Sequence, residues 1–447
     1  MSGFKYSNLV HADSIGTDIF SLIEQLFPIC RSITGDGVRA TLKHIREHIP
    51  LDVHEVPTGT QIYDWTIPRE WNINDAYIKN QKGEKVVDFH NSNLHVVGYS
   101  IPVQKKMSLD ELKEHVFSIP ENPEWIPYRT SYYNESWGFC ISHRQLMSME
   151  DGIYDVLIDS SLEDGTLTYG EYVLPGEIED EILLSAHICH PSLANDNLSG
   201  IALLTHLAKH LQGLKHKYSY RFIFAPGTIG SLTWLARNEQ HALSRVKHGL
   251  VVSCVGDAGG PTYKRSRRGS AEIDLAIEHV LKHACEQSIL DDFSPYGYDE
   301  RQYCSPGFNL PVGLFERSKY GEFPQYHTSA DNLEFISVEH LSESYGIISR
   351  LIDVLENNDT YVNKNPKGEP QLGKRGLYNA IGGDTQAAQK IMAMLWTLNL
   401  SDGEHSLLDI SKRADIPFEL IFSAAQLLRE NGLLKKANNK ISSCSAP

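Results

Sequence analysis

Short apolar runs alternate with helical patterns between about residues 151 and 360. The runs EILLSAH, YSYRFIFAP, HGLVVSCVG and LPVGLF are uninterrupted, and segments with helical spacing of apolar residues separate several of them. Uninterrupted apolar strands joined by helices are typical of a sheet that is buried on both faces. We therefore predict an α/β domain in this part of the chain.

Two earlier segments have different patterns. Residues 17–49 carry apolar side chains at helical spacing on both sides of a Gly-Asp-Gly turn, which predicts two helices. Residues 61–150 are rich in Trp, Tyr, Pro and Asn, and their short alternating segments predict a β-rich module. The next stretch, YDVLIDSSLEDGTLTYGEYVLPG, predicts two paired strands around an Asp-Gly turn.

The last part of the chain predicts a separate domain. Residues 361–384 are polar and rich in Gly, Pro and Lys, as is typical of a linker. Residues 385–445 predict three helices and a short hairpin with the rhythm of a winged-helix domain. We expect residues 1–60 and 151–360 to form one discontinuous α/β domain, with the β-rich module at 61–150 inserted into it.

Composition and charge narrow the classes of protein. The chain has 447 residues and a net charge of −16, so we do not expect it to bind nucleic acid or anionic membranes, which require cationic surface. The N-terminus has no apolar signal region. The sequence also lacks a run of about 18 apolar residues, so we expect no membrane-spanning helix. Seven scattered cysteines without a C-x-x-C pair fit reduced thiols. These features predict a cytoplasmic protein.

Metal-ligand side chains are concentrated in SAHICHPSLANDNLSG, at the junction of a predicted strand and helix. His187 ends the strand, and Asp196 precedes the helix. Open α/β sheets bind ligands in loops at the carboxyl ends of their strands. Further candidates are Asp257 at the end of another strand, and His327 in QYHTSADNLEFIS. Histidine and carboxylate side chains are the ligands that hydrolytic zinc sites use.

Two of these motifs resemble the signatures of a known superfamily. ANDNLSG before a helix and YHTSADNLEFIS later in the same domain are similar to motifs of the dinuclear zinc aminopeptidases. The resemblance implies a mixed eight-stranded sheet covered by helices, and one or two zinc ions. It implies that His187 and Asp257 bind one ion, that His327 binds the other, and that Asp196 bridges them. The whole chain resembles a bacterial family with an aminopeptidase-like domain, an inserted β module and a C-terminal winged helix.

The sequence departs from that superfamily where the general base is expected. The superfamily has a Glu-Glu pair, one a base and one a zinc ligand, in a segment that matches RFIFAPGTIGSLTWLARN. Gly227 and Thr228 stand at that position here. We predict that Glu300, in the loop YGYDERQYCSPGFNLPVG, supplies the missing base, with Glu316 and Glu322 as further candidates.

A second departure concerns the first histidine. Cys189 stands two residues after His187, where the superfamily has an aspartate that orients the histidine. His190 is a candidate extra ligand, and on chemistry alone these three residues could form a mononuclear site.

A basic loop suggests how the substrate is held. The segment YKRSRRGS is the densest basic cluster of the chain. Because arginine forms paired hydrogen bonds with carboxylate and phosphate, we predict that Arg265 or Arg268, with Arg317 and Tyr320, binds an acidic group of the substrate.

The winged helix itself predicts contacts with protein. Its candidate recognition helix, PFELIFSAAQLLRENG, contains Arg429 as its single cation, whereas DNA readout relies on Arg, Lys, Asn and Gln. We therefore expect a role in protein–protein contacts, such as formation of a homo-oligomer.

These patterns predict an aminopeptidase-like zinc metallohydrolase that acts on a small amide, an aminoacyl conjugate or a peptide-like substrate. The missing Glu-Glu pair supports an alternative, a metal- or ligand-binding scaffold protein without the usual catalysis. A third hypothesis, a ligand-sensing transcription regulator, rests on the winged helix alone.

Overall fold

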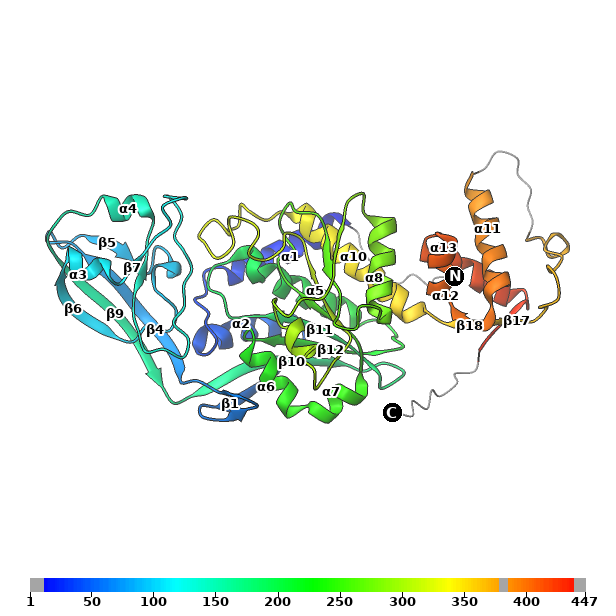
Figure 1. Cartoon of the computed structure of the whole chain (residues 1–447), viewed down its shortest axis with the longest axis horizontal. Helices are drawn as coiled ribbons and strands as arrows, with labels where there is room; N and C mark the ends of the chain where they lie inside the picture. The colour runs from blue at the N-terminus through cyan, green and yellow to red at the C-terminus, as the bar shows by residue number, and fades with distance from the viewer. Residues whose placement is uncertain (1–11, 378–384, 438–447) are drawn as a thin grey trace. The chain divides into compact units, whose positions relative to one another are not determined.

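The computed structural model describes residues 12–377 and 385–437. These residues form two units (Figure 1). The larger unit contains the residues described up to 271 together with 287–345, and the smaller unit contains 272–286 and the residues described from 346 onward. Within the described ranges, no helix has the length and hydropathy that a membrane span requires.

An eight-stranded mixed sheet forms the centre of the larger unit. Its order is β1 (Asp52–Pro57), β10 (Thr166–Leu174), β12 (Ser219–Ala225), β11 (Glu181–His187), β13 (Val246–Val252), β16 (Val312–Glu316), β14 (Thr262–Lys264) and β15 (Ile289–Asp291). Strands β12, β11, β13 and β16 run parallel, while β1, β10 and β14 pair antiparallel with their neighbours toward the centre. Every residue of β11 is buried, as its uninterrupted apolar run predicts. The predicted mixed α/β fold is therefore confirmed.

Helices cover both faces of this sheet. In Figure 1, α1 (Ala12–Leu26) and α5 (Gly200–Leu211) lie above the central strands, and α6 (Ile229–Arg237) and α7 (Glu239–Arg245) lie below them. The helix α2 (Asp36–Arg46) packs on β10 through a buried stripe of Val38, Leu42 and Ile45. Helices α1 and α2 confirm the two helices predicted between residues 17 and 49. The short α9 (Glu300–Tyr303) and the long α10 (Val338–Asn357) follow later in the chain.

The inserted segment has a sheet of its own. Its four strands have the order β5 (Lys85–Asp88), β4 (Glu70–Lys79), β9 (Ile153–Glu163) and β6 (Val103–Ser108). Smaller elements are β2 (Gln61–Ile62), β3 (Trp65–Thr66), the turn η2 (Asn93–His95), α3 (Leu109–Lys113), β7 (Val116–Phe117), β8 (Phe139–Cys140) and α4 (His143–Met147). Strand β9 begins after residue 150, where the sequence analysis placed the end of the module.

The predicted pairing of the two strands around Asp164-Gly165 is wrong. Strand β9 pairs with β4 and β6 in the module, whereas β10 pairs with β1 and β12 in the large sheet. A strand can pair along only two edges. Both edges of β9 and both edges of β10 are already paired with the strands just named, so β9 and β10 cannot pair with each other. The Asp-Gly segment therefore connects two sheets instead of closing a hairpin.

The smaller unit contains the predicted winged helix. Its three-stranded sheet has the order β18 (Asp402–Ser406), β17 (Thr360–Asn363) and β19 (Leu434–Lys436). Its helices are α8 (Glu272–Ala284), α11 (Thr385–Leu400), α12 (Leu407–Ala414) and α13 (Phe418–Glu430), with a short turn η4 (Gly373–Arg375). Strand β17 covers the first residues of the segment expected to be a linker. The rest of that linker from 378 to 384, the end of the predicted domain after 437 and the first 11 residues lie outside the described residues.

Candidate metal centre

The candidate centre lies at the carboxyl end of the central strand β11. His187 is the last residue of this strand and pairs in register with Ala225 of β12. The chain then forms a loop and an irregular turn, Ala194–Ser199, which carries Asp196 into the start of α5. The whole turn is buried, and the Asp196 carboxylate lies next to His187 at the end of the strand. This is the edge of the sheet where α/β folds bind ligands.

Two histidines from distant parts of the chain face the same carboxylate. Asp196 is 0% exposed. Its Oδ1 lies 2.9 Å from Nε2 of His187, and its Oδ2 lies 3.1 Å from Nε2 of His327. Three of the four ligands predicted from the sequence are therefore brought together by the fold.

His190 joins this cluster. Its Nδ1 lies 3.1 Å from Nε2 of His187 and 3.7 Å from Oδ1 of Asp196. One ligand atom from each of these three side chains lies within 4.8 Å of the other two, which is compatible with binding one metal ion. The buried Arg31 donates a hydrogen bond from Nε to the backbone carbonyl of His190 at 2.8 Å and so fixes this loop to the end of α1.

The electrostatics of the cluster favour the protonation states that bind metal. Burial lowers the pKa of His190 to about 3, although Asp196 opposes this shift. Burial alone would raise the pKa of Asp196, but the neighbouring histidines hold it well below its ordinary value. A carboxylate and a neutral imidazole are the forms that coordinate a metal ion.

Asp257, the fourth predicted ligand, contacts other groups. Its Oδ2 accepts a hydrogen bond from Nδ2 of Asn195 at 2.7 Å, and its Oδ1 accepts bonds from the Gly259 N–H and the Ser318 hydroxyl at 2.7 and 2.5 Å. Asp331 likewise accepts hydrogen bonds from the backbone N–H groups of Asn195 and Asp196, at 2.6 and 3.0 Å. Both carboxylates hold the turn that carries Asp196.

A different carboxylate reaches the position of the missing Glu-Glu pair. A Cβ on Gly227 would lie 3.7 Å from the Cβ of His187, so this position adjoins the cluster. The next residue, Thr228, donates its backbone N–H to Oδ1 of Asp299 at 2.7 Å. Asp299 is 2% exposed. Burial raises its pKa, while His187 and the Thr228 N–H act in the opposite direction.

Glu300, which the sequence analysis selected as the base, points elsewhere. Its Oε1 lies 2.7 Å from Nζ of Lys264, and both side chains are buried. Glu300 thus pairs with Lys264, whereas its neighbour Asp299 in the same loop reaches the Thr228 N–H. The two further candidates also have other partners, because Glu316 accepts a bond from the Tyr320 N–H and Glu322 pairs with Lys319.

Two tyrosines that the sequence analysis did not select complete the surroundings. The Tyr298 hydroxyl donates to Oδ1 of Asp196 at 3.1 Å, and its ring stacks on His187 with centroids 4.8 Å apart. Tyr128, from the inserted segment, places its ring edge-on to His190 and His327, at 5.2 and 5.1 Å. Tyr298 belongs to the Tyr-rich loop of Asp299, which is a sequence signal, whereas nothing in the sequence around Tyr128 indicates its place.

Backbone strain is present in the same loops. Four non-glycine residues around the cluster have positive φ angles, namely Ser192 (37°), Thr228 (64°), Cys254 (50°) and His327 (55°). Such conformations are uncommon and costly for residues with a Cβ, and they occur frequently at functional sites. The strain thus supports the cluster as a functional centre.

The residues predicted to bind an acidic group are occupied by protein partners in separate places. Arg265 pairs with Asp292 at 3.0 Å, Arg317 pairs with Glu343 at 2.8 Å, and Nε of Arg268 donates to the Asn309 carbonyl at 2.8 Å. The Tyr320 hydroxyl donates to the Tyr296 carbonyl at 2.5 Å, and its ring lies 5.0 Å from that of Tyr298. Each of these four side chains therefore has a protein partner of its own.

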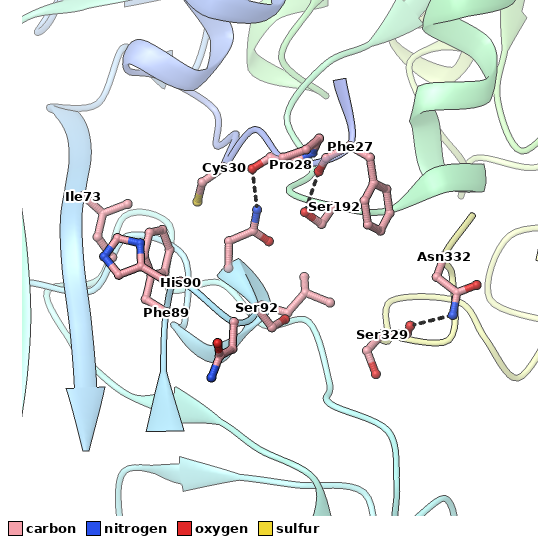
Figure 2. A pocket seen from close by; sticks show the side chains of 13 residues that line it. Phe27, Pro28, Cys30, Ile73, Phe89, His90, Ser92, Ser192, Ser329 and Asn332 are labelled. Atoms are coloured by element: carbon pink, nitrogen blue, oxygen red, sulfur yellow. Dashed lines mark hydrogen bonds between the residues drawn. The ribbon is translucent and has the colours of Figure 1, made fainter. Parts of the chain in front are cut away.

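A cavity of about 600 Å³ lies beside the loops that carry the histidines (Figure 2). Ser192 and Ser329 line it, and each stands two residues after a histidine of the cluster. The other lining residues come from the connection between α1 and α2, the inserted segment and the loop after His327: Phe27, Pro28, Cys30, Ile73, Phe89, His90, Asn91, Ser92, Asn93, Leu94 and Asn332.

The sheet, its helices and the separate C-terminal unit together define an aminopeptidase-like α/β fold joined to a winged helix-turn-helix domain. The chain belongs to the family whose model is described as a domain of unknown function, DUF4910, and that model matches residues 20–358. A winged helix-turn-helix model matches residues 359–436.

Relatives with known names agree with this assignment. A Clostridium acetobutylicum protein, named as a candidate polysaccharide biosynthesis protein with aminopeptidase-like domain, is 56% identical over 95% of this chain and 98% of its own length. The crystal structure of a candidate peptidase from the same organism has a TM-score of 0.91 and 55% identity, over 95% of this chain and 97% of that one. A zinc aminopeptidase from Bacillus subtilis shares the fold alone, with a TM-score of 0.55 and 14% identity over 75% of this chain and 94% of that one.

Proposed function

We propose that the chain is a zinc-dependent hydrolase that cleaves an amide bond in a small molecule such as an aminoacyl conjugate. The observation that carries this proposal is the convergence of His187, His190 and His327 on the buried carboxylate of Asp196. Catalytic zinc sites use three protein ligands, and four candidate groups are present here, so one of the four is available to orient substrate. The fold shared with a zinc aminopeptidase from Bacillus subtilis supports the choice of zinc.

One zinc ion fits these residues better than two. A second ion would need further ligands, but Gly227 and Thr228 occupy the place of the Glu-Glu pair, and Asp257 is bonded to Asn195, Gly259 and Ser318. Burial also raises the pKa of the Cys189 thiol to about 12, so it stays protonated and is a poor ligand.

We further propose Asp299, in place of Glu300, as the general base. A bound zinc ion would polarise the amide carbonyl and lower the pKa of a water to about 7. The Asp299 carboxylate accepts a proton from the attacking water, whose oxygen forms the new bond to the acyl carbon. The same proton then passes to the amine as the amide C–N bond breaks. The raised pKa of Asp299 suits this exchange, since a base works best with a pKa near the operating pH.

Metal content of the purified full-length protein tests the proposed function. Elemental mass spectrometry should find about one zinc per chain in the wild type and a large loss in His187→Ala. His405→Ala is the matched control, because His405 lies in the winged-helix unit and pairs there with Asp402. Absence of zinc after zinc is offered, or hydrolysis of no small amide by the zinc-loaded protein, would overturn the proposal.

A non-hydrolytic scaffold protein is the second candidate function, and the absence of the Glu-Glu pair is the observation that favours it. The two functions differ in one measurable outcome. A scaffold retains zinc and binds a ligand without turnover, whereas the hydrolase releases an amine from a small amide.

We also propose that the winged-helix unit contacts protein, as in a homo-oligomer, and that the reaction takes place in the cytoplasm. Arg429 is the single cation of α13, which supports the first point. None of the six cysteines among the described residues is in a disulfide, which supports the second. Sedimentation equilibrium of the full chain tests oligomerisation, and tight, sequence-dependent DNA binding in a shift assay would contradict the protein-contact role.

A further inference from the structure

The cavity in Figure 2 has a lining without fixed charge. None of its 13 lining residues is an aspartate, glutamate, lysine or arginine. His90 pairs with Asp75 at 3.3 Å, and burial raises the pKa of the Cys30 thiol to about 12. An acidic or basic ligand in this cavity would gain no oppositely charged partner among the lining residues, so the lining does not favour a charged ligand.

The lining instead offers many neutral hydrogen-bonding groups. Three amides and three hydroxyls contribute, those of Asn91, Asn93, Asn332, Ser92, Ser192 and Ser329. The Ser192 hydroxyl donates to the Phe27 carbonyl at 2.6 Å, and Oγ of Ser329 accepts from the Ile126 N–H at 2.9 Å. Nδ2 of Asn93 donates to the Pro28 carbonyl at 3.3 Å, whereas its Oδ1 is buried without a hydrogen-bond partner (Figure 2). Nδ2 of Asn332 donates to the Ser329 carbonyl at 3.4 Å. The amides and hydroxyls of this lining suit a ligand that can both donate and accept hydrogen bonds.

Apolar rings share the lining with these groups. Phe27 and Phe89 both contribute, from the end of α1 and from the inserted segment. Rings next to amides and hydroxyls suit a ligand that has C–H faces together with hydroxyl or amide groups. The volume falls within the range of pockets that hold small molecules.

The cavity adjoins the loops that carry two of the clustered histidines. Ser192 and Ser329 stand two residues after His190 and His327. Leu94, another lining residue, packs with Tyr128, the residue whose ring meets both histidines edge-on. A ligand held in the cavity therefore contacts the loops that carry the candidate metal ligands.

We infer that this cavity binds a neutral, polyhydroxylated part of the substrate, such as an N-acylated sugar. This inference rests on the proposed function, because it makes the sugar the part of the amide substrate that is held while the bond is cleaved at the metal centre. It replaces the acidic group that the sequence analysis expected, since the arginines predicted to bind such a group are paired elsewhere.

Binding of simple probes to the full chain tests the inference. N-acetylglucosamine, its β-1,4-linked disaccharide, glucuronic acid and glycylglycine are titrated at millimolar concentrations, with calorimetry or saturation-transfer NMR as the readout. The neutral N-acyl sugars should bind, and the acid and the dipeptide should bind at least about tenfold more weakly.

Two variants locate the binding to the cavity. Asn91→Leu removes an exposed lining amide, and Asn93→Leu removes a half-buried lining amide that donates to the Pro28 carbonyl. Each should weaken sugar binding by about tenfold, the loss expected for one or two hydrogen bonds. Asn134→Leu is the matched control, because Asn134 is an exposed asparagine of the same inserted segment that does not line the cavity.

Failure of the inference can be separated from failure of the proposed function. Sugar binding that persists in His187→Ala, after its zinc is lost, supports the cavity independently of catalysis. No binding of either sugar, equal binding by the control and cavity variants, or tighter binding of glucuronic acid would overturn the inference even if zinc and amide hydrolysis are both found.

Discussion

Oδ1 of Asp299 accepts a hydrogen bond from the backbone N–H of Thr228 at 2.7 Å. Asp299 immediately precedes α9, whereas Thr228 precedes α6 and stands where related zinc aminopeptidases are expected to carry a glutamate. The bond brings a carboxylate from a different loop to the position that the local sequence leaves without one. Thr228 holds a strained positive φ of 64° while it makes this bond.

The Asp299→Asn variant should lose most of its amide hydrolysis and keep its zinc. We expect Asp299→Asn to lower kcat for a small amide about 10²–10⁴-fold, the usual contribution of a general base. Zinc content should stay at the wild-type level, because the amide keeps the shape of the side chain. Asp292→Asn is the control, since Asp292 lies on the surface and pairs with Arg265. Loss of zinc from Asp299→Asn would instead identify Asp299 as a ligand.

Glu300→Gln should affect stability and leave catalysis intact. Glu300 and Lys264 form a pair whose side chains are 0% and 3% exposed, so the substitution leaves a buried ammonium group without its anion. We expect the free energy of unfolding in urea to fall by about 3–5 kcal/mol. The double variant Glu300→Leu with Lys264→Leu should recover part of this loss. A large drop in kcat at unchanged stability would restore Glu300 as the base.

Removal of zinc should destabilise the larger unit. A metal ion that binds the native cluster stabilises it by mass action, by about 2.7 kcal/mol when free zinc is 100 times Kd. Chelation should therefore lower the unfolding midpoint of the wild type. Asp196→Asn should show no such effect, because Asp196 is the carboxylate that all three histidines face. An equal response of both proteins to chelation would contradict the proposed site.

His190→Ala tests the ligand that the aminopeptidase motif does not contain. Loss of a residue that merely orients a ligand weakens metal binding about 10–100-fold. We expect a larger effect here, measured by competition with a chromophoric zinc chelator, because the His190 imidazole itself faces Asp196. Unchanged zinc affinity would reduce His190 to an ordinary loop residue.

Protonation of His248 should lower the free energy of unfolding as the pH falls below neutral. Burial lowers its pKa to about 3, and Nδ1 has no hydrogen-bond partner. A histidine with a depressed native pKa stabilises the fold above its unfolded pKa of about 6.5, and that contribution is lost as the pH falls from there toward 3. The slope should approach 1.4 kcal/mol per pH unit. Urea titrations of His248→Phe between pH 7 and 4 should show a smaller slope than the wild type, and an equal slope would contradict the assignment.

The sequence by itself determined the elements and much of the centre. Apolar runs and helical periods depend on neighbouring residues, so they predicted the α/β domain, the helices α1 and α2, and the winged helix. Strand ends are also a local property. His187 and Asp196 could therefore be placed together at the end of β11, and a motif resemblance added His327.

Only the tertiary structure decided which side chains meet across loops and sheets. Asp299 and Glu300 are adjacent in the sequence, yet one reaches Thr228 and the other Lys264, because side-chain direction in a turn has no periodic signal. Strands β9 and β10 look like a hairpin, but partners far away in the chain occupy their edges. Tyr128 reaches the histidines from the inserted segment. These outcomes depend on contacts between distant segments, and a local pattern of residues carries no information about such contacts.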